Sequence, residues 1–410
     1  MAVKDKINKL KYLKNFAEEQ VSGYIMPFWR SYSKDKENGG FYGRIENDLT
    51  IDKTADKGVV LNARMLWTFS ISYLKFDVKK DLELADRAYD YIMNNFCDSK
   101  YGGYFWSLKY DGSPLVKKKQ VYAQAFMIYG LCEYYKVNGK QEVLNKAINI
   151  FHLIEDYAFD KKNNGYIEAC DRDWKETNDL KLSKNDLNEK KGMNTHLHIL
   201  EAYTNLYRVW KDTVLKEKLE NLIILFIEKI IDREDNHLIL FFDELWNPKS
   251  SLISFGHDIE SSWLLHEAAL ITGNNKLIQR TINKILKMTV AVLEGYHPNG
   301  AILYEDDRKG LHKDNELEWW VQAEAIVGFL NSYSLKNDPV FLDTAYKISC
   351  FIDKYIVDKK FGEWYFRIDI NGRPNDTYEK AGFWKCPYHN TRACIEILNR
   401  CDKIIGKAVK

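Results

Sequence analysis

The chain is 410 residues long, 45% of its residues are hydrophobic, and 60 lysines and arginines nearly balance 59 acidic residues, which gives a net charge of +1. This length allows a large buried core, whereas the scattered, balanced charge excludes a basic surface built for nucleic acid or anionic lipid and favours a small neutral ligand. Seven cysteines without a CxxC pair argue against a disulfide framework or a zinc site, and the longest aliphatic run, at 222–227, is too short to span a bilayer. The charged amino-terminal segment also lacks the apolar stretch of a signal peptide, so we predict a cytoplasmic protein without a nucleic-acid or membrane partner.

Short segments rich in glycine and aromatic residues recur along the chain, about 62 residues apart. They are NGGFYGR around Gly40, YGGYFW around Gly103, NNGYIEA around Gly165, PNGAILYE around Gly300 and FGEWYFR around Gly362. The interval between Gly165 and Gly300 is about twice as long, and NHLILFFDELW around His237 lies near its middle with a similar alternation but no glycine. The chain is therefore predicted to contain six repeats.

Between these segments, apolar residues recur three and four positions apart, the spacing of amphipathic helices. We expect outer helices near 5–30, 81–96, 142–157, 215–231, 275–294 and 339–356, and inner helices near 60–76, 120–136, 192–211, 256–272, 316–334 and 385–404. Twelve helices in six hairpins predict an all-α (α/α)6 barrel, a single domain over 1–410 with short β-hairpins in its connecting loops. An open helical solenoid is the alternative, but the chain shows no polar capping repeats.

The first two turns of the predicted inner helices carry an unusual set of polar and aromatic residues. They are Arg64, Tyr122, Gln124, Asn194, His198, His257, Glu260, Trp319, Trp320, Glu324, His389 and Arg392. In a barrel of parallel inner helices these side chains converge on one mouth, where helix N-termini present unpaired N–H groups. Each has a structural alternative: Arg64 can be an ion-pair partner, and His257 with Glu260 an ordinary buried pair. His196, two residues before His198, points elsewhere and is expected to be a surface or packing residue.

Other chemistries find less support in the sequence. HEAAL at 266–270 lacks the second histidine of a zinc protease, and no glycine-rich nucleotide motif is present, so we predict no metal and no cofactor. A glycoside hydrolase is the main rival, because this barrel commonly hosts glycosidases with two carboxylates across the scissile bond. The candidates for that role are Asp258, Glu260, Glu318 and Glu324. Three histidines and an arginine, however, suit proton abstraction beside a carbonyl better.

Several motifs follow one another in an order that resembles the cellobiose 2-epimerases of the N-acylglucosamine 2-epimerase superfamily. They are NGGFYG, DKGVVLNARMLW, MNTHLHILEAY, SFGHDIE, WWVQAEAIVGF and KCPYHNTR, over about residues 25–400. The resemblance implies a cofactor-free (α/α)6 barrel that converts β-1,4-linked disaccharides such as cellobiose or lactose into their 2-epimers. It implies acid/base roles for His257 and His389, contacts to the open-chain C1–C2 oxygens from His198 and Arg64, and support of His257 by Glu260. The sugar subsites would be shaped by Tyr122, Asn194, Trp320, Trp364 and Trp384, with Asp186 of the loop 171–191 near the second sugar.

The implied reaction opens the pyranose ring, removes the C2 proton to form a cis-enediolate, and returns a proton to the opposite face. The closest alternatives are aldose–ketose isomerisation and 2-epimerisation of N-acylglucosamine or mannose. The preferred disaccharide stays open at this point. We expect a monomer or a weak homo-oligomer, because no exposed apolar stripe in the sequence demands a partner.

Overall fold

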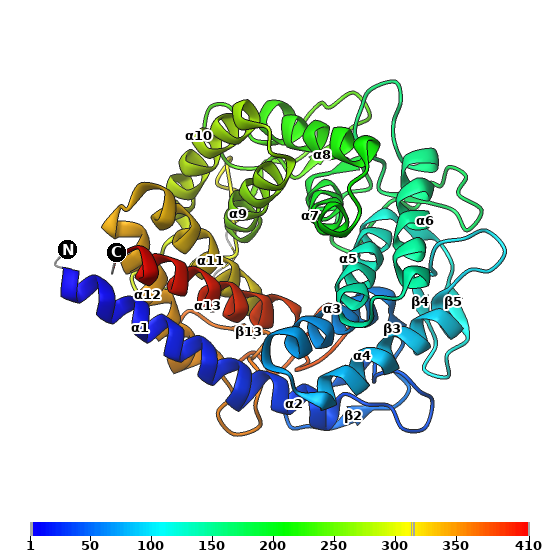
Figure 1. The fold of residues 1–410 in the computed structure, drawn as a ribbon, viewed down its shortest axis with the longest axis horizontal. Coiled ribbons are helices and arrows are strands. Elements are labelled where there is room, and N and C mark those ends of the chain that lie inside the picture. Colours follow the sequence, from blue (N-terminus) through cyan, green and yellow to red (C-terminus); the bar gives the residue numbers. More distant parts are fainter. Residues whose placement is uncertain (1–2, 313, 315, 409–410) are drawn as a thin grey trace.

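The computed structural model describes residues 3–312, 314 and 316–408, and its helices form two concentric rings (Figure 1). The inner ring consists of α3 (Val59–Phe76), α5 (Val121–Asn138), α7 (Met193–Val209), α9 (Phe255–Thr272), α11 (Trp319–Lys336) and α13 (Tyr388–Ala408). Each inner helix packs on the next, and α13 packs on α3, which closes the ring. Because they contact other helices on almost every side, the inner helices are apolar nearly all round, as a buried helix must be.

The outer ring covers the inner helices with more amphipathic ones. It consists of α1 (Val3–Glu19) continued by α2 (Met26–Tyr32), α4 (Lys79–Tyr91), α6 (Gln141–Tyr157), α8 (Thr213–Leu225), α10 (Asn275–Ala291) and α12 (Pro339–Phe351). A π-helical turn at Gln20–Ile25 joins α1 to α2, so together they act as one outer helix. With α1 and α2 counted as one helix, the predicted barrel of twelve helices in six hairpins is confirmed.

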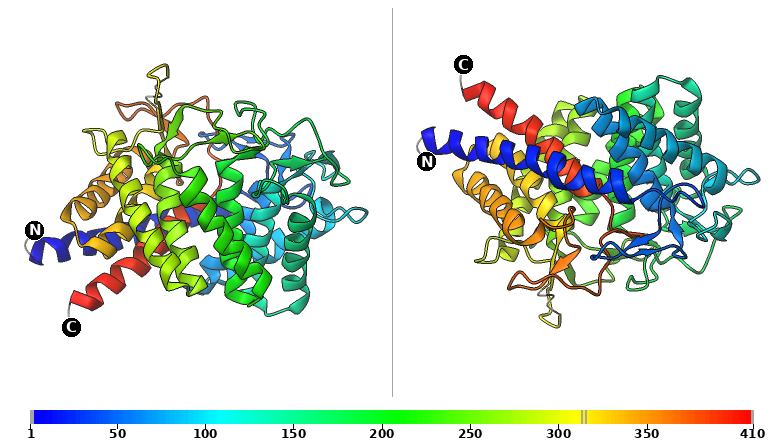
Figure 2. Two further views of the ribbon diagram at one scale, coloured as in Figure 1. Left: turned by 90° about the horizontal axis from the view of Figure 1, so that it is seen from above. Right: turned by 90° about the horizontal axis from the view of Figure 1, so that it is seen from below.

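The sixth hairpin is formed by the two ends of the chain. Helix α1 packs along α13, and the two termini lie side by side in both views of Figure 2. A bridge between Ile45, which follows α2, and Ala381, which precedes α13, completes this unit. Ring closure therefore depends on contacts between segments more than 300 residues apart, such as the Lys9–Asp343 and Lys14–Asp402 ion pairs.

Short antiparallel strands bracket the helical hairpins, as predicted. The pairs are β3 (Lys57–Gly58) with β4 (Ser107–Leu108), β6 (Lys119–Gln120) with β7 (Ala169–Cys170), β8 (Lys191–Gly192) with β9 (Phe241–Phe242), β10 (Leu252–Ser254) with β11 (Glu305–Asp307), and β12 (Leu317–Glu318) with β13 (Arg367–Ile368). Two local hairpins, β1 (Arg44–Ile45) with β2 (Ile51–Asp52) and β4 with β5 (Pro114–Val116), complete the layer. One strand precedes the inner helix and its partner follows the outer helix, so each pair closes the base of one hairpin.

The recurring glycine segments are tight turns after the outer helices. In five of the six turns a starting aspartate accepts the backbone N–H two residues later, at Asp35, Asp98, Asp160, Asp232 and Asp358, and His297 takes this place in the turn at Gly300. Gly39 and Gly102 adopt positive φ before the residue that ends the turn, and Asn236 takes the same left-handed conformation at φ 66° in the repeat that lacks glycine. Asparagine tolerates this region better than most residues, which explains how that repeat keeps its turn.

The fourth residue of four inner helices locks one of these turns in place. Gln124, His196, Asp258 and Gln322 accept the backbone N–H of Tyr104, Tyr166, Leu238 and Ile302, respectively. His196 is fully buried and also bonds the Gly192 carbonyl through Nδ1, so it is a packing histidine, as expected. The seven cysteines are all free, and no described helix has the length and apolarity needed to cross a membrane.

His196 should make the stability of the protein fall on acidification. Burial lowers its pKa to about 4, whereas in the unfolded chain it titrates near pH 6.5. Between these values the unfolded state binds more protons, so stability falls as pH decreases through this window. Glutamine stands at the equivalent positions 124 and 322 and does not titrate. As pH falls from 6.5 to 4, we therefore expect the free energy of unfolding of His196→Gln to rise relative to that of wild type by about 1.4 kcal/mol per pH unit. Urea unfolding of both proteins across this range measures the difference, and a constant difference would contradict the assignment.

Candidate active site

The internal repeat places a ring of side chains inside the barrel. The sixth residues of α3, α5, α7, α9 and α11 are Arg64, Phe126, His198, Glu260 and Glu324. Arg392 from α13 completes the ring by bonding two of them, Glu260 and Glu324. All of these residues are buried, and five of them were predicted at the mouth. Gln124, predicted there as well, instead bonds the backbone of Tyr104 and holds a turn.

His389 is held by a carboxylate through Nδ1, and its Nε2 has no hydrogen bond within the described chain. Its Nδ1 lies 2.7 Å from Glu324 Oε1 and 3.9 Å from Glu260 Oε1. Burial, with the positive charges of Arg64 and Arg392, holds the pKa of His389 well below its usual value, so the imidazole is neutral near pH 7. An ionised carboxylate can only accept, so the proton sits on Nδ1 and the lone pair on Nε2, where it can take a proton.

His257 is held differently from the way the sequence predicted. Its Nδ1 lies 2.8 Å from the Ser254 hydroxyl, and the expected bond to Glu260 is absent among the described residues. Glu260 is one turn deeper in the barrel, where it binds Arg392. Burial and the charge of His198 lower the pKa of His257 to about 3, so this imidazole is neutral as well. The support of His257 by Glu260 is therefore corrected: Ser254 orients His257, and Glu260 lies closer to His389.

His198, Arg64 and Tyr122 form the neighbouring wall, as the sequence predicted. His198 Nδ1 lies 2.9 Å from Glu201 Oε2, and its ring packs edge-on against Tyr122 with centroids 4.8 Å apart. Arg64 donates to the Tyr122 hydroxyl at 2.7 Å and stacks over the Phe126 ring at 4.2 Å. Its Nε is buried without a partner in the described chain. A guanidinium held by rings and a phenol, with an unused donor, suits a ligand oxygen that becomes negatively charged.

A buried ion network lies next to the histidines. The sequence analysis placed its members Arg392, Glu260 and Glu324 at the mouth but did not single out Glu201 or Tyr388. Arg392 bonds Glu201, Glu260 and Glu324, and Tyr388 also donates to Glu201. Burial, together with the charge of Glu324, raises the pKa of Glu260 to about 7. For Glu201, Arg392 and His198 outweigh burial and lower the pKa to about 2. Since Glu201 and Glu324 in turn hold His198 and His389, Arg392 supports two of the three imidazoles through their carboxylate partners.

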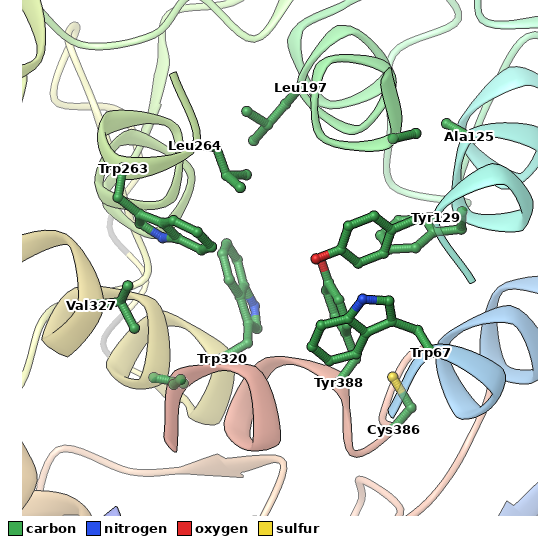
Figure 3. Close-up of a cluster of buried hydrophobic side chains, with 14 of the residues drawn as sticks. Trp67, Ala125, Tyr129, Leu197, Trp263, Leu264, Trp320, Val327, Cys386 and Tyr388 are labelled. Carbon is green, nitrogen blue, oxygen red and sulfur yellow. The ribbon is translucent and has the colours of Figure 1, made fainter. Parts of the chain in front are cut away.

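Trp320 contacts both predicted acid/base histidines. Its ring centroid lies 4.8 Å from that of His257 and 5.4 Å from that of His389, and its Nε1 donates to Glu318. Figure 3 shows Trp320 and Tyr388 reaching from α11 and α13 into the barrel interior. Gly256 allows this packing, because a Cβ there would lie 2.6 Å from the Trp320 ring. The neighbouring Trp319 packs on Phe366 instead, as expected for adjacent helical residues that face different ways.

The other residues predicted to bind the sugar lie at different distances from the histidines and differ in their contacts. Trp384 is partly exposed near Tyr122, with centroids 6.1 Å apart, and packs against Trp106, an aromatic residue that the sequence analysis did not single out. Asn194, one turn before His198, has a buried Oδ1 without a partner in the described chain. Asp186 accepts the Ser183 N–H at 2.7 Å within its own loop, and burial raises its pKa.

Trp364 does not lie with these residues. It is 1% exposed, donates to Gln20 of the outer layer at 2.9 Å and bridges Val357. This position corrects the expectation that Trp364 shapes a sugar subsite. Its indole fills the space between the turn and the outer helix instead.

Glu260, Glu324 and His389 are spaced closely enough to bind a metal ion, with ligand atoms within 4.8 Å of one another. Arg392 donates to both carboxylates, so a guanidinium already supplies the positive charge at this position. A metal ion there would have to displace Arg392 or share its carboxylates. The geometry therefore fits an arginine-centred network better than a metal centre.

Comparison of the chain with known protein families, sequences and structures agrees with this architecture. A model of the N-acylglucosamine 2-epimerase family matches residues 40–393. The chain is 47% identical to the cellobiose 2-epimerase of Bacteroides fragilis, covering 94% of this chain and 98% of that protein, and 42% identical to that of Dictyoglomus turgidum, covering 95% and 99%. The structure of cellobiose 2-epimerase from Bacillus thermoamylovorans matches with a TM-score of 0.90 at 40% identity, covering 95% of this chain and 99% of that one.

The chain therefore belongs to the N-acylglucosamine 2-epimerase family. It is a carbohydrate epimerase, an isomerase, and within the family it is most readily grouped with the cellobiose 2-epimerases. The predicted family and enzyme class are confirmed by these similarities.

Proposed function

We propose that the chain inverts C2 of the reducing-end glucose of β-1,4-linked disaccharides, converting cellobiose to glucosylmannose and lactose to epilactose. The observation that carries this proposal is the pair His257 and His389. Each has its Nδ1 engaged, neither has a hydrogen bond at Nε2 within the described chain, and both contact Trp320. Two neutral imidazoles that face a common interior are what proton removal on one face and return on the other require.

In the proposed mechanism, the open-chain aldose binds with its C1 and C2 oxygens near Arg64 and His198. One histidine takes the C2 proton through Nε2 and becomes an imidazolium, while the electron pair of the C–H bond forms a cis-enediolate whose charge Arg64 stabilises. Rotation about C2–C3 presents the opposite face of C2. The other histidine, which has taken up a proton from solvent, returns it to C2 there, and the first imidazolium releases its proton to solvent, so the step balances without net change of charge. No electron is gained or lost overall, so the step requires no redox cofactor, and Arg64 supplies the positive charge that a metal ion would otherwise provide.

A second sugar is supported by the aromatic residues at the mouth. Trp384 and Trp106 are partly exposed, with ring centroids 5.9 Å apart, beside the Arg64–Tyr122 wall. Flat rings with a polar edge pack well on pyranose faces. We therefore propose that Trp384, Tyr122, Asn194 and Trp320 bind the disaccharide, and that Asp186 meets the distal sugar. We also propose that the chain works in the cytoplasm as a monomer or weak homo-oligomer.

Two alternatives differ at specific atoms. An aldose–ketose isomerase would share every group but return the proton to C1 rather than C2. A glycosidase needs two carboxylates open to the sugar, whereas Glu260 and Glu324 are buried and bound to the same arginine. The geometry therefore favours enediolate chemistry over hydrolysis.

Incubation of cellobiose with the protein in D2O, followed by NMR, tests the proposal. The 2-epimer should appear with deuterium at C2 and an intact glycosidic bond, and lactose should react similarly. Glucose and N-acetylglucosamine should react far more slowly, because they leave the second subsite empty. Deuterium at C1 of a ketose would indicate an isomerase, release of glucose a hydrolase, and an unchanged sugar would refute enzymatic action on cellobiose.

A further inference from the structure

The residue that precedes each of five inner helices can be compared across the internal repeat. This residue is Gly58, Gln120, Gly192, Ser254 or Glu318, before α3, α5, α7, α9 and α11. In two repeats its side chain turns to a residue of the site: the Ser254 hydroxyl bonds His257, and the Glu318 carboxylate accepts the Trp320 N–H. Glycine at two of the equivalent positions shows that the fold does not need a side chain there. Ser254 is therefore a departure from the repeat at the point where His257 is held.

The partner of His257 differs in charge from the partners of the other histidines. Glu324 holds His389 and Glu201 holds His198, both through Nδ1 and both with a carboxylate. An ionised partner stabilises an imidazolium by a charge-assisted hydrogen bond, typically about twice as strong as a neutral one. A hydroxyl can hold the ring in place, but it can either donate or accept, and it adds no negative charge. His257 thus has orientation without a counter-ion, whereas His389 has both.

The other groups around His257 do not replace that counter-ion. Charged or titratable groups near it come from α7 (His198), from its own helix (Glu260) and from α13 (His389), and Trp320 of α11 packs on its ring at 4.8 Å. His198 and His389 add no negative charge, and Glu260 is engaged by Arg392. Ser254 is 1% exposed, so no bulk water substitutes for its hydroxyl.

We propose that Ser254 is a positioning residue for His257: its hydroxyl aims Nε2 of His257 at C2 of the sugar. This inference rests on the proposed epimerase function. The two faces of C2 are served by histidines with different partners, a hydroxyl for His257 and a carboxylate for His389. Removal of the hydroxyl should therefore impair one face more than the other.

The test compares Ser254→Gly, Ser254→Thr and wild type. Glycine copies Gly58 and Gly192, and the backbone at Ser254, with φ −115° and ψ 97°, is open to any residue. We expect Ser254→Gly to lower kcat about 10- to 100-fold, the range for partners that orient an imidazole, with little change in KM because Ser254 does not contact the sugar. Ser254→Thr, which keeps the hydroxyl, should recover most of the rate. Ser262→Ala, which removes a buried hydroxyl bonded only to the Ile259 carbonyl of the same helix, should behave as wild type.

Isotope exchange and nitrogen NMR separate orientation from a general structural effect. In D2O, Ser254→Gly should keep C2 exchange without inversion from one of the two epimers, cellobiose or glucosylmannose, and lose it from the other. The ¹⁵N shift of His257 Nδ1 should change when its hydrogen bond to the hydroxyl is lost, while the shifts of His389 stay unchanged. A Ser254→Gly protein with wild-type kcat and ¹⁵N shifts, equal loss of exchange from both epimers, or failure of threonine to restore the rate would each overturn the inference. Absence of C2 exchange in wild type would instead refute the proposed function, so the two failures are distinguishable.

Discussion

Replacement of His389 by asparagine should slow epimerisation of cellobiose by about 10²- to 10⁴-fold or more, the usual cost of removing a general acid or base. The same loss is expected for His257→Asn. Asparagine keeps a polar side chain of similar reach, and its amide can still bond Glu324 or Ser254, but it takes up no proton at neutral pH. Initial rates of 2-epimer formation measure the loss.

The matched control for both variants is His196→Gln, which changes a buried histidine of the same barrel that only holds a turn. Its rate should stay close to wild type at pH 7. If each histidine serves one face, each single variant should also retain C2 exchange from one epimer while net inversion is lost. Near-normal epimerisation by both His389→Asn and His257→Asn would show that other groups carry the proton.

Arg392→Met should destabilise the protein by about 3–5 kcal/mol at pH 7, the range for removing one partner of a buried ion pair. The guanidinium is 3% exposed and bonds Glu201, Glu260 and Glu324. Methionine fills part of the volume but leaves these carboxylates in a buried site without a counter-charge. Equilibrium denaturation measured by far-UV circular dichroism gives the change in the free energy of unfolding.

Arg280→Met provides the comparison at an exposed ion pair. Arg280 lies 2.6 Å from Glu228, but both side chains are 45% exposed, so solvent screens the interaction. Its loss should cost less than about 1 kcal/mol. If Arg392→Met destabilised the protein no more than Arg280→Met, the buried carboxylates would be able to become protonated at little cost in free energy. Arg392 would then not be needed to stabilise Glu201, Glu260 and Glu324.

Much of the fold was predictable because each repeat is marked by residues that act on their near neighbours in the sequence. An aspartate, a turn with left-handed residues and a helix pattern recur about every 62 residues, and each of these signals depends on near neighbours. The same repeat places the sixth residues of successive inner helices on one ring, so Arg64, His198 and Glu260 could be grouped without coordinates.

The partners of these residues were harder to predict because they come from other helices. The i,i+3 spacing allowed a bond between His257 and Glu260, but spacing alone does not reveal that Arg392, 132 residues further along, binds Glu260. Trp364 shows the opposite case, in which a local signal was overlooked. It follows the turn as Tyr104 and Tyr166 do, and all three form the equivalent bridge and are buried. Alignment of the repeats would have placed Trp364 in the protein interior.

The sixth hairpin also sets an order for assembly during synthesis. Among the helices of the barrel, α1 leaves the ribosome before the others, yet its inner partner α13 is made after all of them. Until then the faces of α11 and α3 that α13 covers stay open, and the five preceding hairpins can stack only as an unclosed arc. Since α13 carries His389 and Arg392, a nascent chain acquires the second acid/base histidine and the centre of its ion network only when the ring closes. Premature termination before α13 would therefore yield an inactive chain with two exposed apolar seams, a form prone to aggregate.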